Sequence, residues 1–214
     1  MTHPITTLFC DVGGVMLTNG WDRAARKLAC RTFDLDCDEV DERHHLTFDA
    51  FEEGKLSLDE YLDRTVFYAP RPFRREAFKD FMFSRSEPLP DMLDALRELK
   101  AAHGIKIVTV NNEGRELNEH RIRTFGLGCF IDAFVSSCFV HFRKPDADIF
   151  RIALDIAQTA PEEAVYIDDR ALFVEVAGTL GIRGVVHKSA AETLAALKEM
   201  GPFAAYCPAG PDLG

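Results

Sequence analysis

Polar side chains stand at or just after the ends of four short apolar segments of the chain: Asp11, Asn111 with Asn112, Lys144, and Asp168 with Asp169. Any one of these positions suits an ordinary turn or helix cap, because Asn and Asp favour both. The set as a whole indicates more, since three carboxylates brought together repel one another unless a cation lies between them. Oxygen ligands of this kind suit Mg²⁺. Lys144 and the two amides then become donors for the oxygens of a phosphoryl group.

The apolar segments that carry these residues are predicted to be parallel β-strands. Strand signals occur at 6–11, 105–110, 131–136, 164–167 and 184–187, and several are apolar throughout, as in strands covered on both faces. Helical patterns occur at 90–103, 116–125, 146–158, 171–180 and 190–200. This alternation predicts an α/β fold with a doubly wound parallel sheet, in which ligands bind beyond the carboxyl ends of the strands.

The interval 17–87 breaks the alternation and is predicted to be an inserted α-helical cap. It has no convincing parallel-strand signal, and helical patterns occur at 22–33, 39–51, 58–68 and 74–83. So much helix is too long for an ordinary crossover between strands. We therefore expect a catalytic core at 1–16 and 88–201, a cap at 17–87, and a surface tail rich in Gly and Pro at 202–214.

Composition excludes several classes of function. With 214 residues, of which 47% are hydrophobic, the chain is long enough for a substantial core. A net charge of −10 and the lack of Lys and Arg clusters argue against nucleic acid as a partner. No apolar run is long enough to span a membrane and no secretory signal is visible, so we expect a cytoplasmic protein. The six cysteines lack metal-site spacing and are interpreted as reduced thiols.

Four segments, taken in order, resemble the motifs of the haloacid dehalogenase (HAD) superfamily. LFCDVGGVML is similar to the strand that ends in a nucleophilic Asp, and IVTVNNEGREL is similar to the second motif with Asn111 in the hydroxyl position. RKPDADIF places Lys144 in the third motif, and VYIDDR places Asp168 and Asp169 in the fourth. The Asp-x-Gly-Gly-Val and Ile-Asp-Asp-Arg variants resemble a subgroup of sugar-phosphate phosphatases and HAD-like domains fused to other enzymes.

The resemblance implies a two-step phosphatase mechanism. Asp11 would attack phosphorus, and water would then hydrolyse the aspartyl-phosphate. The implied Mg²⁺ ligands are an Asp11 carboxylate oxygen, the Gly13 carbonyl oxygen, Asp168, and Asp169 directly or through water. Lys144 would hold Asp11 and balance charge.

The resemblance also assigns phosphate-binding roles to the two amides. Asn112 and Asn111 would donate hydrogen bonds to phosphate oxygens.

The first motif departs from the superfamily at Gly13, where most of its phosphatases carry a second Asp as general acid and base. General acid or base catalysis contributes about 10²- to 10⁴-fold in rate. Another residue, a water molecule or a good leaving group must replace it, or the protein is a weak phosphatase. A haloacid dehalogenase and a non-catalytic HAD-like binding domain are therefore kept as alternatives. The acidic pair Asp168 and Asp169 favours the Mg²⁺-dependent phosphatase.

The predicted cap offers fewer signals about the substrate. Lys55, in the loop EEGKLS, and Trp21 are candidate substrate contacts, with a solvated lysine and core packing as their alternatives. The seven phenylalanines of the segment 48–83 indicate a cap core or a homodimer face. Because a helical cap shields a site from macromolecules, we expect a small phosphorylated metabolite, such as a sugar phosphate, as the substrate.

Overall fold

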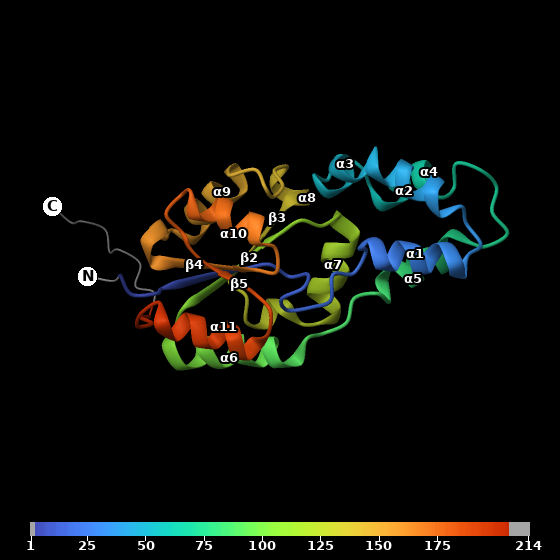
Figure 1. The fold of residues 1–214 in the computed structure, drawn as a ribbon. Coiled ribbons are helices and arrows are strands. Elements are labelled where there is room, and N and C mark those ends of the chain that lie inside the picture. Colours follow the sequence, from blue (N-terminus) through green and yellow to red (C-terminus); the bar gives the residue numbers. More distant parts are fainter. Residues whose placement is uncertain (1–2, 206–214) are drawn as a thin grey trace.

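The computed structural model describes residues 3–205, and its centre is a parallel sheet of five strands (Figure 1). The strands are β1 (Thr7–Cys10), β2 (Lys106–Asn111), β3 (Ala133–Ser136), β4 (Ala164–Asp168) and β5 (Arg183–Val186), in the order β3-β2-β1-β4-β5. In this order β1 is central. Its Cys10 is level with Thr109 of β2 and Ile167 of β4, so that Asp11 and Asp168 emerge side by side.

Helices cover both faces of the sheet, which explains why its strands are apolar on both sides. One layer contains α9 (Asp148–Ala157) and α10 (Ala171–Gly178), and the other contains α6 (Pro90–His103) and α11 (Ala190–Glu199) (Figure 1). Separate clusters of buried side chains fill the two interfaces, one around Phe9, Phe150 and Tyr166 and one around Leu8 and Leu96. The doubly wound α/β fold predicted from the sequence is confirmed.

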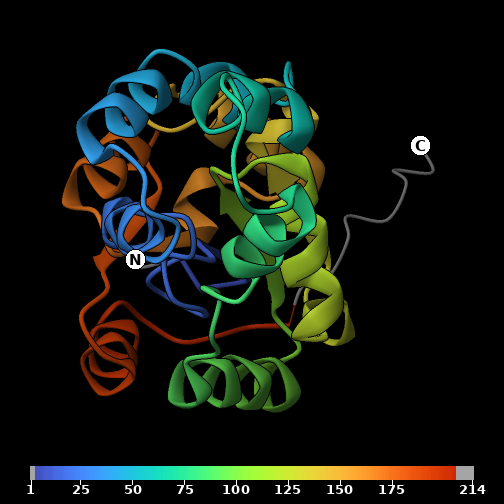
Figure 2. The same cartoon turned by 90° about the vertical axis from the view of Figure 1, so that its right-hand side faces the viewer.

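Five helices lie between β1 and α6 and stand beyond the carboxyl ends of the strands (Figures 1 and 2). They are α1 (Arg23–Thr32), α2 (Cys37–His45), α3 (Phe48–Glu52), α4 (Leu58–Thr65) and α5 (Arg75–Phe83). Aromatic residues, among them Trp21, Tyr61 and Phe78, form a third buried cluster here. The segment therefore has a core of its own, and its residue limits, 17–87, stay a prediction.

The chain enters and leaves this helical segment through two paired linkers. Leu17 forms an antiparallel bridge with Pro88. Thr18 N donates to Glu87 O at 2.9 Å, and Leu89 N donates to Met16 O at the same distance. Both ends of the segment are thus fastened to each other just beyond β1.

Two local features differ from the sequence prediction. The helix predicted at 39–51 is two helices, α2 and α3. Thr47 separates them, because its Oγ1 returns to Arg43 O at 2.7 Å and its N–H bonds to His44 O, which tightens the end of α2. The short helix α8 (Ser137–Val140) was not predicted, because four residues carry no readable helical period.

The C-terminal end of the described chain lies beside the sheet. Phe203 pairs with Ile5 beside the sheet, and the rest of the predicted tail, 206–214, lies outside the described residues. Five cysteines of the described part, Cys10, Cys30, Cys37, Cys129 and Cys138, are free thiols, whereas Cys207 lies outside it. Within residues 3–205, no helix has the length and apolar character required to cross a bilayer.

Candidate active site

Asp11 follows β1 directly, and its carboxylate is nearly buried at the end of the sheet. Its Oδ1 accepts hydrogen bonds from Val12 N at 2.8 Å and from Lys144 Nζ at 3.0 Å. Across residues 3–205, no donor reaches the second oxygen, Oδ2. Burial raises the pKa of Asp11 to about 6, against the opposing charge of Lys144 and with an added contribution from the carboxylate of Asp168. One oxygen is thus fixed while the other remains free to react or to bind a cation.

Lys144 joins two carboxylates in a site with only 1% of its side chain exposed. Its Nζ lies 2.8 Å from Asp168 Oδ2 and donates to Tyr166 OH at 3.0 Å. Tyr166 in turn donates to Asp168 Oδ2. Because a buried ammonium must be paired, this network stabilises Lys144 and holds Asp11 in one orientation.

Asn112 determines the position of the Lys144 backbone. Its Oδ1 accepts from Lys144 N, and its Nδ2 donates to Lys144 O, both at 2.8 Å. The neighbouring Asn111 is 2% exposed and donates to Asn118 Oδ1 at 3.4 Å. Both amides line the cavity beside Asp11, although each already has a protein partner.

Three carboxylates, those of Asp11, Asp168 and Asp169, offer oxygen atoms that all lie within 4.8 Å of one another. Asp169 Oδ2 accepts from Asn19 Nδ2 at 3.3 Å, whereas its buried Oδ1 has no hydrogen-bond partner in the described part of the chain. Gly14 makes this approach possible, because it has φ +72° and a Cβ there would lie 2.4 Å from Asp169 Oδ2. An orphaned buried oxygen in a triad of hard ligands fits a Mg²⁺ site.

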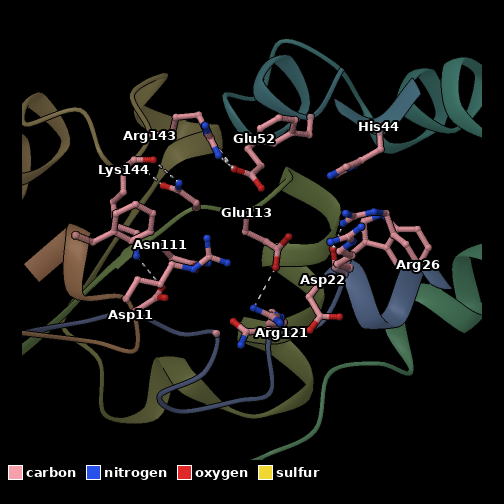
Figure 3. A pocket seen from close by; sticks show the side chains of 18 residues that line it. Asp11, Asp22, Arg26, His44, Glu52, Asn111, Glu113, Arg121, Arg143 and Lys144 are labelled. Carbon is pink, nitrogen blue, oxygen red and sulfur yellow. Dashed lines mark hydrogen bonds and ion pairs between the residues drawn. The ribbon is translucent and has the colours of Figure 1, made fainter. Parts of the chain in front are cut away.

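A cavity of about 280 Å³ opens from Asp11 toward the helical segment (Figure 3). Six cationic side chains and four carboxylates line it, although the whole chain carries a net charge of −10. The cations are Arg23, Arg26, Arg121, Arg143, Lys144 and Arg170. The cavity is therefore locally suited to an anion.

A buried ion pair that the sequence analysis missed lies in this cavity. Glu113 Oε2 is 3.0 Å from Arg121 Nη1, and Arg121 is 2% exposed. The guanidinium also donates from Nε to Ser86 Oγ at 2.9 Å and from Nη2 to Thr18 O at 2.8 Å. Leu117 and Arg121 lie one helical turn apart on the inward face of α7 (Arg115–Thr124), a spacing that could have indicated a buried Arg.

A hydrogen-bond chain runs from Trp21 through Tyr61 to His44 on the opposite side of the cavity. Trp21 Nε1 can only donate, and it does so to Tyr61 OH at 2.9 Å. When the Tyr61 hydroxyl donates to His44 Nδ1, 2.8 Å away, the proton of the imidazole is on Nε2. Figure 3 shows the ring reaching from α2 toward the cavity. His44 is thus a neutral donor, since burial and the charge of Arg26 lower its pKa to about 3.

The two predicted substrate contacts lie in different places. Trp21 lines the cavity while its ring packs in the aromatic cluster. Lys55 is exposed and pairs with Glu53 at 2.6 Å, outside the cavity lining. Its loop is held against α8, because Gly54, at φ +69°, lies so close that a Cβ would be 2.2 Å from Cys138 O.

Comparison with known proteins identifies the family of the chain. The family model of haloacid dehalogenase-like hydrolases matches residues 5–181. The chloroplast flavin mononucleotide hydrolase 1 of Arabidopsis thaliana is 27% identical over 161 residues. That match covers 74% of this chain and 64% of the Arabidopsis protein.

Solved structures share the fold at low identity. A predicted HAD-like hydrolase from Porphyromonas gingivalis has a TM-score of 0.74 and 19% identity, covering 91% of this chain and 98% of its own. A HAD family enzyme from Bacteroides thetaiotaomicron, solved with magnesium and inorganic phosphate, has a TM-score of 0.72 and 21% identity, covering 86% and 94%. The L-2-haloacid dehalogenase of Xanthobacter autotrophicus, with chloropropionic acid covalently bound, has a TM-score of 0.60 and 16% identity, covering 89% and 81%.

Proposed function

The chain belongs to the haloacid dehalogenase-like hydrolase family, and from this premise we propose that it is a Mg²⁺-dependent phosphatase of small metabolites. Asp11 is the nucleophile of this reaction and the cytoplasm its compartment. A single observation carries the proposal, namely the clustering of Asp11, Asp168 and Asp169 within 4.8 Å. Attack on carbon by one carboxylate needs no such cluster, whereas attack on a phosphate monoester must overcome the charge of the substrate.

The residues present fit a Mg²⁺ ion. Asp11 Oδ2, the orphaned Oδ1 of Asp169, Asp168 and the carbonyl oxygen of Gly13 are the proposed ligands. When bound, Mg²⁺ supplies charge neutralisation between the anionic nucleophile and the anionic substrate.

The side chains of the protein divide the phosphoryl transfer between them. An Asp11 oxygen attacks phosphorus, a P–O bond to the nucleophile forms, and the P–O bond to the leaving group breaks. Lys144 keeps the Asp11 carboxylate aligned and balances the charge that collects on phosphorus-bound oxygens. Asn111 and Asn112 line the same space and are proposed as further donors to the phosphate. Water then hydrolyses the aspartyl-phosphate and regenerates Asp11.

The cavity favours a small substrate. Ligand pockets commonly measure about 300–1,000 Å³, and this one, at about 280 Å³, lies at the small end. A sugar phosphate suits that volume better than a flavin nucleotide, the substrate type in the name of the Arabidopsis relative. The absence of nucleic acid and membrane partners, and the homodimer alternative, stay predictions.

The test is a hydrolysis screen over phosphorylated metabolites, including sugar phosphates and flavin mononucleotide, with Mg²⁺ and with EDTA. We expect Mg²⁺-dependent release of phosphate and a loss of about 10⁴-fold or more in Asp11→Asn, because the nucleophile is removed. Activity that survives EDTA or Asp11→Asn contradicts the mechanism. Halide release from a 2-haloacid supports a dehalogenase instead, and Mg²⁺ binding with no turnover on any substrate supports a binding domain.

A further inference from the structure

The proposed reaction requires a proton donor that Gly13 does not supply. When the P–O bond breaks, its electron pair stays on the leaving oxygen, and an alkoxide is a poor leaving group unless it receives a proton. General acid catalysis of this kind contributes about 10²- to 10⁴-fold. The described residues that line the cavity contain four carboxylates, Asp11, Asp22, Glu52 and Glu113, and one imidazole, His44.

Most of these groups have other tasks. Asp11 is the nucleophile, and Asp22 caps α1 by accepting from Ala25 N at 2.8 Å. Glu52 Oε2 accepts from Arg143 Nε at 2.9 Å and from its Nη2 at 2.6 Å, so this carboxylate holds the Arg143 guanidinium with two hydrogen bonds. His44 is neutral, so its imidazole does not act as an acid at neutral pH. Glu113 remains.

Arg121 links Glu113 to the space beside Gly13. A Cβ built on Gly13 would lie 3.0 Å from Asn19 Oδ1 and 3.6 Å from Arg121 Nη1. The same nitrogen holds Glu113 Oε2 at 3.0 Å. Arg121 therefore connects the space beside Gly13, two residues after the nucleophile, to a carboxyl group that reaches the cavity from the loop between β2 and α7. Figure 3 shows the pair of Glu113 and Arg121.

The backbone fixes Glu113 independently of its ion pair. Glu113 N donates to Ser137 Oγ at 3.1 Å, and this hydroxyl donates to Glu52 O at 2.6 Å. Glu113 thus lies where the helical segment meets the sheet, which is the side of the cavity that a leaving group would occupy.

We propose that Glu113 is the general acid and base of the phosphatase reaction, held in place by Arg121. This inference rests on the proposed function. In the first step the Glu113 carboxyl gives its proton to the leaving oxygen, directly or through one water, as the P–O bond breaks. In the second step the Glu113 carboxylate takes a proton from the water that attacks the aspartyl-phosphate, and the carboxyl group is restored while phosphate and Asp11 separate.

The charges around Glu113 agree with this role. Burial raises the pKa of the Glu113 carboxyl to about 7, the charge of Arg121 lowers it, and the charges of Glu52 and Asp11 raise it. The Gly114 backbone N–H favours the charged form. A group that titrates near neutral pH can serve as both acid and base in one cycle.

The test compares two leaving groups in the Mg²⁺-loaded enzyme. Glycerol phosphate leaves as an alkoxide and needs a proton, whereas p-nitrophenyl phosphate leaves as a stabilised phenolate. We expect Glu113→Gln to lower kcat/KM about 10²-fold or more for glycerol phosphate and less than about 5-fold for p-nitrophenyl phosphate. Glu119→Gln, an exposed carboxylate on α7, is the matched control and should change neither. An equal loss on both substrates overturns the inference.

The wild-type enzyme provides a second arm in case Glu113→Gln fails to fold. Its kcat/KM for glycerol phosphate should decline above about pH 7, while that for p-nitrophenyl phosphate should not. If kcat/KM changes with pH above about pH 7 in the same way for both substrates, the assignment to Glu113 is overturned. If the wild type hydrolyses neither these substrates nor any phosphate ester of the screen with Mg²⁺ present, the phosphatase proposal itself fails. Equal losses or equal pH dependence in an active enzyme overturn only the assignment to Glu113.

Discussion

The cavity has a floor at the strand ends and a wall in the helical segment, and the two are built differently. The floor is Asp11 and Lys144 together with the residues that contact them or cluster with Asp11, namely Tyr166, Asp168 and Asp169. The wall is Trp21, His44 and Phe48 together with Tyr61 behind them. In the floor, buried charges have several partners each, and Lys144 alone contacts three side chains. In the wall, aromatic rings surround a single chain of hydrogen bonds that ends at His44.

This difference separates two tasks. A phosphoryl group is the same in every phosphate ester, so the groups that act on it can be fixed and fully paired. The leaving group varies among substrates, and the helical segment that faces it presents His44 and the rings of Trp21 and Phe48 beside charged side chains. Changes in the floor should therefore affect turnover of all substrates, whereas changes in the wall should affect affinity for particular ones.

After loss of the nucleophile itself, the largest effect is expected for Lys144→Met in the floor. This change leaves the Asp11 and Asp168 carboxylates buried without their cation, which typically costs about 3–5 kcal/mol of stability. It also removes charge stabilisation in the transition state, worth about 10²- to 10³-fold in kcat. Urea denaturation and steady-state kinetics measure the two effects. Lys198→Met, on the exposed face of α11, is the control, and a loss in Lys144→Met no greater than in this control would contradict the role of the floor.

A second effect in the floor concerns Mg²⁺ rather than turnover. Asp169→Asn removes one proposed ligand, and we expect about a tenfold or greater loss of Mg²⁺ affinity by calorimetry without substrate. In EDTA the variant should be at least as stable as the wild type, because one of three clustered carboxylates is gone. Unchanged Mg²⁺ affinity would exclude Asp169 as a ligand.

The wall is tested by His44→Phe, for which a smaller effect is expected. Loss of the Nε2–H donor should raise KM for a sugar phosphate about tenfold, the value of one hydrogen bond, and leave kcat within about twofold. His45→Phe, the exposed neighbour on α2, is the control. If kcat falls as far as in Lys144→Met, the distinction between floor and wall is wrong.

The smallest effect is a pH dependence of stability that originates in the wall. The ordinary pKa of histidine is 6.5, and burial lowers that of His44 to about 3. Below about pH 6.5 the unfolded chain therefore binds a proton that the native protein excludes, so the free energy of unfolding falls as pH falls. Between pH 7 and 5.5 we expect a loss of about 0.5–1 kcal/mol, discounted for partial exposure of the ring. Denaturation curves of His44→Phe should show a free energy of unfolding without this pH dependence. The same change of stability with pH in the variant and the wild type would contradict the prediction.

The floor could be predicted from the sequence because each of its charged residues ends or follows an apolar strand. Asp11, Lys144, Asp168 and Asp169 all converge as the parallel topology requires. Asn112 shows the limit of that argument. Its chain position suggests a phosphate donor, yet its amide clamps the Lys144 backbone, a contact between residues 32 positions apart that no local pattern reveals.

Apart from Trp21, the wall could not be predicted, and neither could Glu113, for a physical reason. Their function depends on packing between the helical segment and the core, such as the Ser137 hydroxyl that joins Glu113 N to Glu52 O. His44 looked like one of two adjacent histidines, and only its contact with Tyr61 distinguishes it from His45. Contacts of this kind come from tertiary structure, which periodicity and motif spacing do not encode.

The paired linkers at Leu17 and Pro88 make the helical segment an exchangeable cassette. Because the chain enters and leaves the core through neighbouring backbones, a short turn could join them without displacing β1 or Asp11. We expect replacement or enlargement of the segment to alter which molecules are accepted while Asp11, Lys144, Asp168 and Asp169, which all come from outside it, stay in place. Substrate preference in this protein would then be a modular trait that evolution or design can exchange.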